Sequence, residues 1–313
     1  MNTNSLLNCD AEKGICEILD SSSVQNSADQ LEGFNSEKIS IVYFTDPICS
    51  SCWGIEAQLR KFKLEYGNSV DIDYRMGGLL PSWDIYNSGG ISKPSDVAEH
   101  WEEVAPHYKM PIDGGVWLED PLNSSYPPSI AFKAAQMQDR KKAIAFLRIM
   151  REMVFLDKLN ICKTENLQEA ASKANLNVEQ WKNDHENNAE VEFNKDLQLA
   201  RQLGVRGFPT LLFVKGNQIK EILYGSKPYH DLEKRLLKID AQLPKIEYSK
   251  NWKDLFVIYP TLTTQEFAVL SDISFENAME FLLALNLENK IGRKEIKNGD
   301  LWILEGLQPL KQN

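Results

Sequence analysis

Two cysteines separated by two residues lie where a buried strand passes into a helix, and this arrangement restricts the fold more than any other part of the sequence. The preceding run, KISIVYFT, is apolar, β-branched and aromatic, which predicts a strand buried on both faces. After Cys49 and Cys52, the segment CWGIEAQLRKFKLEYG repeats apolar residues at helical spacing. The next run, VDIDYRM, alternates as a strand does, so the stretch predicts a β-α-β unit with both cysteines at the strand-to-helix turn.

The position of this cysteine pair favours thiol–disulfide chemistry. The free N–H groups and the dipole at a helix start stabilise negative charge, so we expect the pKa of Cys49 to be lowered and its thiolate to be the nucleophile. Cys52 lies one turn later on the same face, where it would resolve a mixed disulfide formed on Cys49. The alternatives are two packed cysteines or half of a zinc site, since a zinc site needs four ligands.

Three further cysteines lie outside the pair. Cys9 and Cys16 are interpreted either as a small disulfide-closed loop or redox shuttle to Cys49, or as two exposed thiols without a role. They would also supply the two ligands that a zinc site lacks. Cys162 is expected to be a lone, buried or half-buried thiol. The four histidines form no ligand pattern, so we expect no metal and no cofactor.

The segment Gly207–Thr210 reads GFPT and precedes a second apolar run. A proline directly before a buried strand is disfavoured in a central ladder, but it fits a tight turn if the Phe208–Pro209 bond is cis. The backbone of Phe208 would then lie beside the cysteine pair and hydrogen-bond an incoming peptide. We therefore predict that Phe208 and Pro209 bind substrate, and that Trp53 borders the same surface, with packing at the helix start as its main role.

Other side chains near the pair have two interpretations each. Asp46 is read as a structural cap, with modulation of the cysteines by a nearby acid as the alternative. Trp83, Trp101 and Trp117 are read as core residues, with a peptide-binding surface as the alternative.

The rest of the chain divides by composition. Residues 1–37 are polar and predict a flexible leader, whereas residues 93–203 read as mainly helical. Residues 211–224 predict two strands joined by a KGN turn, followed by a closing helix. Beyond Pro244, two helices precede two short strands joined at Asn298-Gly299, which is a winged-helix pattern.

Residues 38–242 resemble the DsbA-like branch of the thioredoxin superfamily, through the motifs DPICSSCWG, YRMGGLLPSW, YPPSIAFKAAQ and GVRGFPTLLF. Within this branch the sequence is similar to cytoplasmic FrnE-like and YjbH/SpxH-like members, which carry Asp-Pro before the cysteine pair and Trp after it. The resemblance implies an α/β thioredoxin fold (38–80 and 204–243) with a helical insertion (81–203). A winged-helix-like domain (251–313) lies outside the family pattern. The family resemblance also implies that Cys49 is the nucleophile, Cys52 the resolving thiol and Pro209 the cis-proline.

Charge and hydropathy restrict the partners. The chain of 313 residues carries a net charge of −10, which argues against nucleic acid. The second C-terminal helix, residues 274–287, contains Glu276 and Glu280 but no lysine or arginine. No apolar run reaches the length of about 18 residues that a membrane span needs, and no secretory signal follows Met1. We therefore expect a cytoplasmic protein, in which five cysteines do not form a structural disulfide framework.

These observations predict a cytoplasmic thiol–disulfide oxidoreductase or isomerase acting on protein or small thiol and disulfide substrates. The main alternative is a non-enzymatic adaptor that presents a client protein to a Clp-type protease, as YjbH/SpxH-like relatives do, with the C-terminal domain contacting a protein partner. A zinc-bound structural protein is another alternative. Glutathione-dependent isomerases and transferases on the same scaffold usually have serine where this chain has Cys49, so the intact pair argues against that class.

Overall fold

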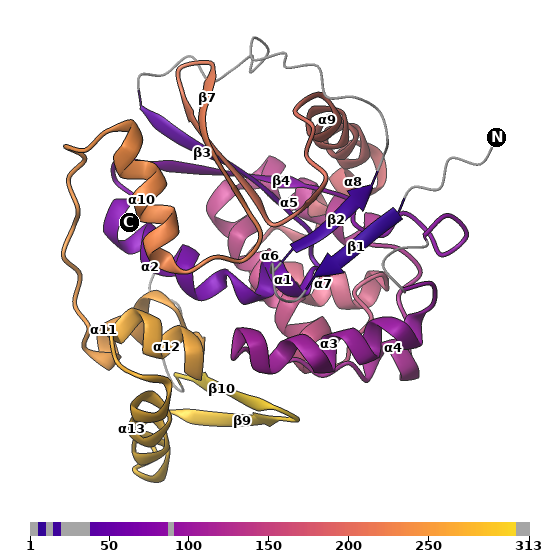
Figure 1. Ribbon diagram of the computed structural model, residues 1–313. Coiled ribbons are helices and arrows are strands. Elements are labelled where there is room, and N and C mark those ends of the chain that lie inside the picture. The colour runs from indigo at the N-terminus through magenta and orange to yellow at the C-terminus, as the bar shows by residue number, and fades with distance from the viewer. Residues whose placement is uncertain (1–5, 11–14, 20–37, 87–90, 305–313) are drawn as a thin grey trace.

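A four-stranded sheet with the order β4-β3-β6-β7 forms the centre of the protein (Figure 1). The computed structural model describes residues 6–10, 15–19, 38–86 and 91–304. Strand β3 (Ile39–Thr45) pairs in parallel with β4 (Asp71–Met76) and antiparallel with β6 (Thr210–Lys215). Strand β6 then pairs antiparallel with β7 (Gln218–Tyr224). The parallel pair and the antiparallel hairpin are those that the sequence predicts.

The strands follow from their side chains. Ile41 to Phe44 are all buried in β3, because helices cover both faces of the sheet at this central strand. Strand β7 lies at the edge, and it alternates between more and less exposed residues. The predicted KGN turn joins β6 to β7, and Gly216 takes the left-handed conformation that this turn needs, with φ of +63°.

The helix after the cysteines is interrupted. The sequence predicts one helix, whereas the structure forms α1 (Ser50–Gly54) and α2 (Glu56–Tyr66), separated at Ile55. Helix α3 (Pro94–Tyr108) approaches α1 closely, since a Cβ on Gly54 would lie 2.5 Å from the ring of Tyr108. The Tyr108 hydroxyl also lies 2.7 Å from the Ser51 hydroxyl, so the short α1 is held against α3 by its small residues.

Helices fill the interval between β4 and β5, as predicted. In the described part of this interval, α3 is followed by α4 (Val116–Glu119), α5 (Tyr126–Gln138), α6 (Arg140–Leu156), α7 (Thr164–Lys173), α8 (Val178–Asn187) and α9 (Ala189–Gln202). Helix α10 (Tyr229–Ile239) closes the domain after β7 and packs near α2.

A second sheet, with the order β1-β2-β5, connects the N-terminal leader to the proline turn. Strands β1 (Leu6–Asp10) and β2 (Ile15–Leu19) form an antiparallel hairpin, and β2 pairs with β5 (Gly207–Phe208). The sequence predicts a flexible leader over residues 1–37, but the short runs LLNCD and ICEIL form strands because β5 supplies a backbone partner. The other leader residues lie outside the described residues.

The C-terminal elements form a smaller unit with its own core. They are α11 (Trp252–Ile258), β8 (Thr261–Thr263), α12 (Thr264–Ser271), α13 (Phe275–Leu287), β9 (Gly292–Ile296) and β10 (Gly299–Ile303). The three strands pair in the order β8-β10-β9, and a hairpin joins β9 to β10 where Asn298-Gly299 predicts one. Phe256, Phe267, Leu282 and Trp302 lie in this core.

A buried ion cluster holds the C-terminal unit on the central domain. The carboxylate of Glu266, at the start of α12, accepts two hydrogen bonds from Arg148 of α6, at 2.8 and 3.0 Å. Arg60 of α2 lies 3.3 Å from the same carboxylate. Burial acts to raise the pKa of Glu266, but the charges of Arg148 and Arg60 hold it below its usual range. One buried carboxylate therefore joins three helices.

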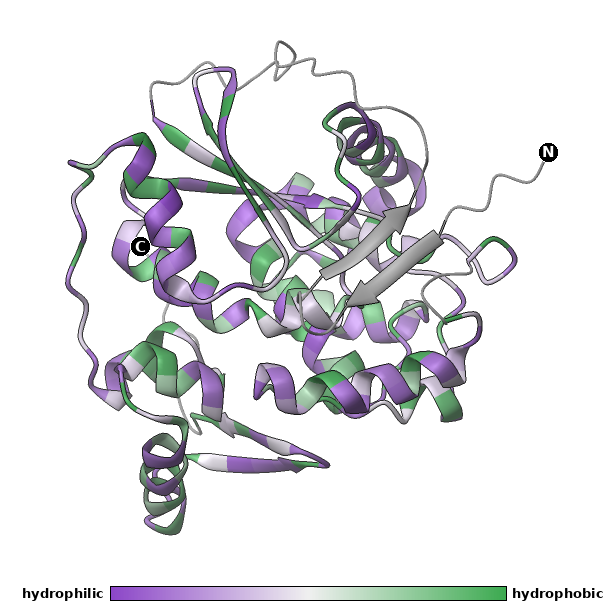
Figure 2. Cartoon of the chain, in the orientation of Figure 1, coloured by the Kyte–Doolittle hydropathy of each residue, from purple (hydrophilic) through white to green (hydrophobic). Residues whose placement is uncertain are grey.

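The outer elements of the C-terminal unit differ in hydropathy. Figure 2 shows mostly hydrophilic residues along β9, whereas α13 carries both kinds. Two large hydrophobic side chains of α13 face solvent, with exposed fractions of 41% for Phe281 and 83% for Leu287. Among the helices that the structure describes, none has the length and hydropathy of a membrane span.

We expect the substitution Glu266→Gln to lower the free energy of unfolding by about 3–5 kcal/mol, because it removes the buried counter-charge that Arg60 and Arg148 share and leaves Arg148 with Glu152. Chemical denaturation followed by circular dichroism measures this loss. The matched control is Glu276→Gln on α13, where the side chain is 73% exposed and the expected change is within about 0.5 kcal/mol. Equal effects of the two substitutions would contradict the role given to the ion cluster.

Candidate functional site

The cysteine pair lies at the junction of β3 and α1, as predicted. Cys49 is the N-cap of α1, and its sulfur accepts a hydrogen bond from the backbone N–H of Cys52 at 3.3 Å. Both are free thiols, and both side chains are completely buried. The helix start is therefore built as a redox site would be, but neither sulfur reaches the surface.

The proline turn lies beside the pair. The Phe208–Pro209 peptide bond is cis, which confirms the prediction. The thiol of Cys49 donates to the carbonyl oxygen of Phe208 at 3.7 Å. The ring of Phe208 packs over Gly77, where a Cβ would lie 2.0 Å from two ring atoms. The structure thus brings together Cys49, Cys52 and Phe208, although the backbone edge predicted to bind substrate is already paired with β2.

The acidity of the two cysteines is the reverse of the prediction. Burial raises the pKa of Cys49 well above its ordinary value, and the hydrogen bond with Cys52 acts in the same direction. Burial also acts to raise the pKa of Cys52, but the hydrogen bond from Cys49 and the charge of Arg151 together lower it. The expected low pKa of Cys49 is wrong, because its removal from water outweighs the N–H groups of the helix.

Asp46 supports the loop that carries the cysteines. One of its carboxylate oxygens accepts from the backbone N–H of Ile48 at 3.1 Å. The other accepts from the N–H of Leu79 at 2.7 Å and from the Ser125 hydroxyl at 2.8 Å. Burial raises the pKa of Asp46 to about 6. These contacts agree with the cap interpretation, and the charge of Asp46 also contributes to the raised pKa of Cys49.

Arg151 of α6 is a central residue that the sequence analysis missed. Its guanidinium is completely buried, donates to the Thr45 hydroxyl at 2.6 Å and to the Asp46 carbonyl at 3.3 Å, and forms an ion pair with Glu56. The Arg151 guanidinium therefore contacts both the end of β3 and the start of α2. The available signal was an arginine within the largely apolar run IMREMVFL, where only Glu152 is also charged.

Trp53 is a packing residue in this structure. Its side chain is fully buried, and its indole N–H donates to the carbonyl of Pro111 at 3.0 Å. The guanidinium of Arg148 lies 4.4 Å from the centre of its ring. The predicted substrate contact of Trp53 therefore finds no exposed surface, because the side chain faces α6 and the Pro111 segment.

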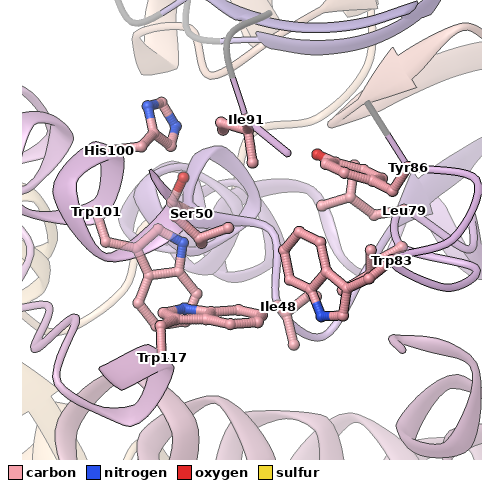
Figure 3. Close-up of a pocket in the computed structure, with 11 residues that line it drawn as sticks. Ile48, Ser50, Leu79, Trp83, Tyr86, Ile91, His100, Trp101 and Trp117 are labelled. Atoms are coloured by element: carbon pink, nitrogen blue, oxygen red, sulfur yellow. The ribbon is translucent and has the colours of Figure 1, made fainter. Parts of the chain in front are cut away.

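An aromatic pocket lies next to the start of α1. Figure 3 shows it between Ser50, Trp83, Trp101 and Trp117. Trp101 and Trp117 are buried and Trp83 is half-buried, in agreement with the core interpretation. The cavity has a volume of about 30 Å³, whereas a cavity needs roughly 10–15 Å³ to hold one water molecule. It is too small for the side chain of a bound peptide unless the aromatic rings move.

The remaining predicted positions carry no assembled site. Cys162 is half-buried, as expected, and burial raises its pKa to about 11. In the part of the chain that the structure describes, no group of three or more His, Cys, Asp or Glu side chains is placed to hold a metal. The side chains of Cys9 and Cys16 lie outside that description, so their predicted roles stay predictions.

Comparison with known proteins identifies the family. A family model described as thioredoxin matches residues 43–234. The ClpXP adapter protein SpxH of Halalkalibacterium halodurans is 32% identical over 300 residues, covering 94% of this chain and 96% of that protein. The chain belongs to the SpxH family of thioredoxin-like proteins. SpxH of Bacillus subtilis is 30% identical over 275 residues, covering 86% of this chain and 90% of its own length.

A solved structure supports the fold. The cytosolic disulfide reductase DsbM of Pseudomonas aeruginosa superposes with a TM-score of 0.52 at 19% identity, over 64% of this chain and 99% of its own. At this identity the likeness concerns the fold alone. It agrees with the predicted α/β thioredoxin-like fold.

The relatives correct the predicted activity. SpxH proteins that align over most of the chain are named as ClpXP adapters, so the prediction of a DsbA-type oxidoreductase is wrong. The physical reason lies in the site, since Cys49 is buried and its pKa is raised, whereas an exchange enzyme needs a reachable thiolate. The sequence motif predicts the fold and the position of the cysteines, but it does not predict whether the sulfur is accessible to solvent.

We expect Asp46→Ala to lower the free energy of unfolding by about 2–4 kcal/mol, because the buried N–H groups of Ile48 and Leu79 lose their acceptor. The comparison is Ser125→Ala, which removes one donor from the same carboxylate and also the acceptor of the buried Leu80 N–H, and should cost about 1–2 kcal/mol. The pKa of about 6 lies above the usual value of 3.8, so stability from Asp46 is present at low pH and is lost as pH rises through 6. Relative to Asp46→Asn, the wild-type protein should therefore gain stability between pH 7 and pH 4, and denaturant titrations showing no such gain would contradict a buried, raised pKa.

Proposed function

We propose that this chain is a non-enzymatic adaptor that presents a client protein to a ClpXP-type protease. The observation that carries the proposal is its alignment over almost its whole length with relatives named as ClpXP adapter SpxH. Such a function needs two protein-binding surfaces and no chemistry. It therefore accommodates a cysteine pair that is closed to solvent.

The contacts around the cysteine pair support a structural role for this site. Asp46 and Arg151 both hold the loop by hydrogen bonds, and Trp53 of α1 packs against Arg148 and bonds to the Pro111 carbonyl. In this proposal the cis-proline turn at Phe208–Pro209 shapes the edge strand β5 rather than a catalytic groove. These residues position the scaffold on which the adaptor surfaces lie.

The C-terminal unit is the proposed docking surface for a protein partner. Residues 251–313 lie beyond the matched family region, which ends at residue 234, and we propose that they form a winged-helix-like domain. Its helix α13 exposes Phe281 and Leu287 and carries Glu276 and Glu280. A mixed apolar and acidic helix suits a protein partner, whereas its charge disfavours nucleic acid.

We also propose the domain boundaries that the sequence indicates. Residues 38–80 and 204–243 would form the thioredoxin-like domain, and residues 81–203 the helical insertion. Helix α6 of the insertion contacts both of the other units, through Arg151 and Arg148. This attachment would hold the C-terminal unit, which carries the proposed docking surface, in a fixed position on the central domain.

The adaptor proposal is tested in cells that carry a proteolytically inactive ClpP, which retains the proteins delivered to it. We expect a defined set of trapped proteins to disappear when the gene for this chain is deleted. The variant Cys49→Ser/Cys52→Ser should restore the set to within about twofold, because serine keeps the buried packing and the adaptor needs no thiol. A trapped set that does not depend on this chain would overturn the proposal, and so would loss of the set in a correctly folded double-serine variant.

The docking surface is tested by Phe281→Asp/Leu287→Asp on α13. Purified client from the trap should lose about tenfold or more in affinity, corresponding to about 1.4 kcal/mol, because two exposed apolar contacts are replaced by charges. Val191→Asp on α9 is the matched control, since Val191 is also exposed, at 59%. Isothermal titration calorimetry compares the variants, and equal affinities would place the partner surface elsewhere.

A further inference from the structure

Backbone pairings and hydrogen bonds link the positions of four cysteines. In the β1–β2 hairpin, Cys9 lies at the register position opposite Cys16. In the β2–β5 pairing, Cys16 lies opposite Phe208. The carbonyl of Phe208 accepts the hydrogen bond of Cys49, which in turn adjoins Cys52. Residues that are far apart in sequence, in the leader and at the cysteine pair, are thus brought to a single place (Figure 1).

Strand β5 is an edge strand of the second sheet, and strand β2 of the same chain pairs with it. It has only two residues, since Pro209 follows and has no N–H to continue a ladder. Strand β2 pairs with it antiparallel, as an extended peptide does in strand addition. Residues opposite each other in such a pair have Cα atoms about 4.5–5.5 Å apart. The backbone therefore brings Cys16 to the residue whose carbonyl contacts the Cys49 sulfur.

We propose that Cys16 and Cys49 form an intramolecular disulfide when the protein is oxidised, and that this bond locks the N-terminal hairpin onto the β5 edge. The inference goes beyond the proposed adaptor function and does not depend on it. In this inference Cys16 has a disulfide partner within the same chain, and the buried Cys49 has a structural role instead of a catalytic one.

The burial of Cys49 makes an internal partner the favoured one. A sulfur with no exposed surface is closed to a disulfide on another protein. A residue of β2, by contrast, is already paired through the backbone with Phe208, whose carbonyl contacts the Cys49 sulfur. The same geometry that disfavours external substrates therefore selects Cys16.

The redox steps balance with a hydroperoxide as oxidant. Hydrogen peroxide takes two electrons and two protons from the thiols of Cys49 and Cys52, which form a disulfide, and two water molecules are released. The thiolate of Cys16 then attacks the sulfur of Cys49, so that the Cys16–Cys49 bond forms and the Cys49–Cys52 bond breaks. Cys52 leaves as a thiolate beside the buried charge of Arg151 and takes up the proton that Cys16 lost.

The lock changes what the β5 edge can bind. In the reduced protein, β2 is held by backbone pairing over two residue positions, Cys16–Phe208 and Glu17–Gly207. So short a pairing exchanges with competing strands. With the disulfide formed, β2 cannot leave, and an extended segment of another protein is excluded from the edge.

Disulfide mapping on the full-length protein tests the proposal. The variant Cys9→Ser/Cys52→Ser retains Cys16, Cys49 and Cys162. It is treated with hydrogen peroxide, blocked with N-ethylmaleimide, digested without reduction and analysed by mass spectrometry. In this variant the peroxide oxidises Cys16 and Cys49 directly, and two water molecules are again released. We expect a Cys16–Cys49 linked peptide whose yield does not change over a tenfold dilution of the protein, as an intramolecular bond requires.

The matched control adds Cys16→Ser to the same variant and should give no linked peptide with Cys49. The wild-type protein is mapped in parallel, so that a folding defect of the variants cannot decide the result. Absence of the Cys16–Cys49 link in the oxidised wild-type protein, or its replacement by Cys9–Cys16 alone or by links between molecules, would overturn the proposal.

Amide hydrogen exchange tests whether the Cys16–Cys49 disulfide also holds strand β2 on β5. Oxidation of the wild-type protein should slow amide exchange of residues 15–19 by about tenfold or more, because the hairpin no longer opens locally, and a reductant should reverse the effect. Unchanged exchange in a protein that contains the mapped disulfide would show that the bond does not lock the strand, and would overturn that part of the proposal.

Discussion

Two buried arginines on helix α6 organise the rest of the structure. Arg151 reaches the end of β3 and fixes the loop before the cysteines, while Arg148 covers Trp53 and binds Glu266 of the C-terminal unit. Each charge is compensated at short range, and such compensation is what allows a charge to be buried at all. The cysteine junction and the attachment of the C-terminal unit therefore depend on adjacent turns of a single helix.

The cysteine pair shows how the surroundings decide the chemistry of a motif. The backbone N–H of Cys52 at the start of α1 donates to the Cys49 sulfur, but complete burial raises the pKa of that thiol. The scaffold of a disulfide enzyme can thus be kept while its reactive group is withdrawn from solvent.

Local patterns predicted the elements that local chemistry determines. The buried strand before Cys49, the cis bond at Pro209 and the hairpin at Asn298-Gly299 all agree with the structure. The strands of the leader were missed because they depend on a partner about 190 residues away, which no short pattern encodes. Arg151, the high pKa of Cys49 and the buried indole of Trp53 depend on long-range packing, and a single sequence does not reveal burial of that kind.

The use of ion pairs to attach the C-terminal unit has a consequence for its behaviour on warming. Contacts between apolar surfaces gain little further strength per unit area at high temperature, whereas the desolvation cost of burying charges falls. The junction formed by Glu266, Arg148 and Arg60 is thus of the kind that weakens least with heat. The two units should remain joined up to the temperature at which their separate cores melt.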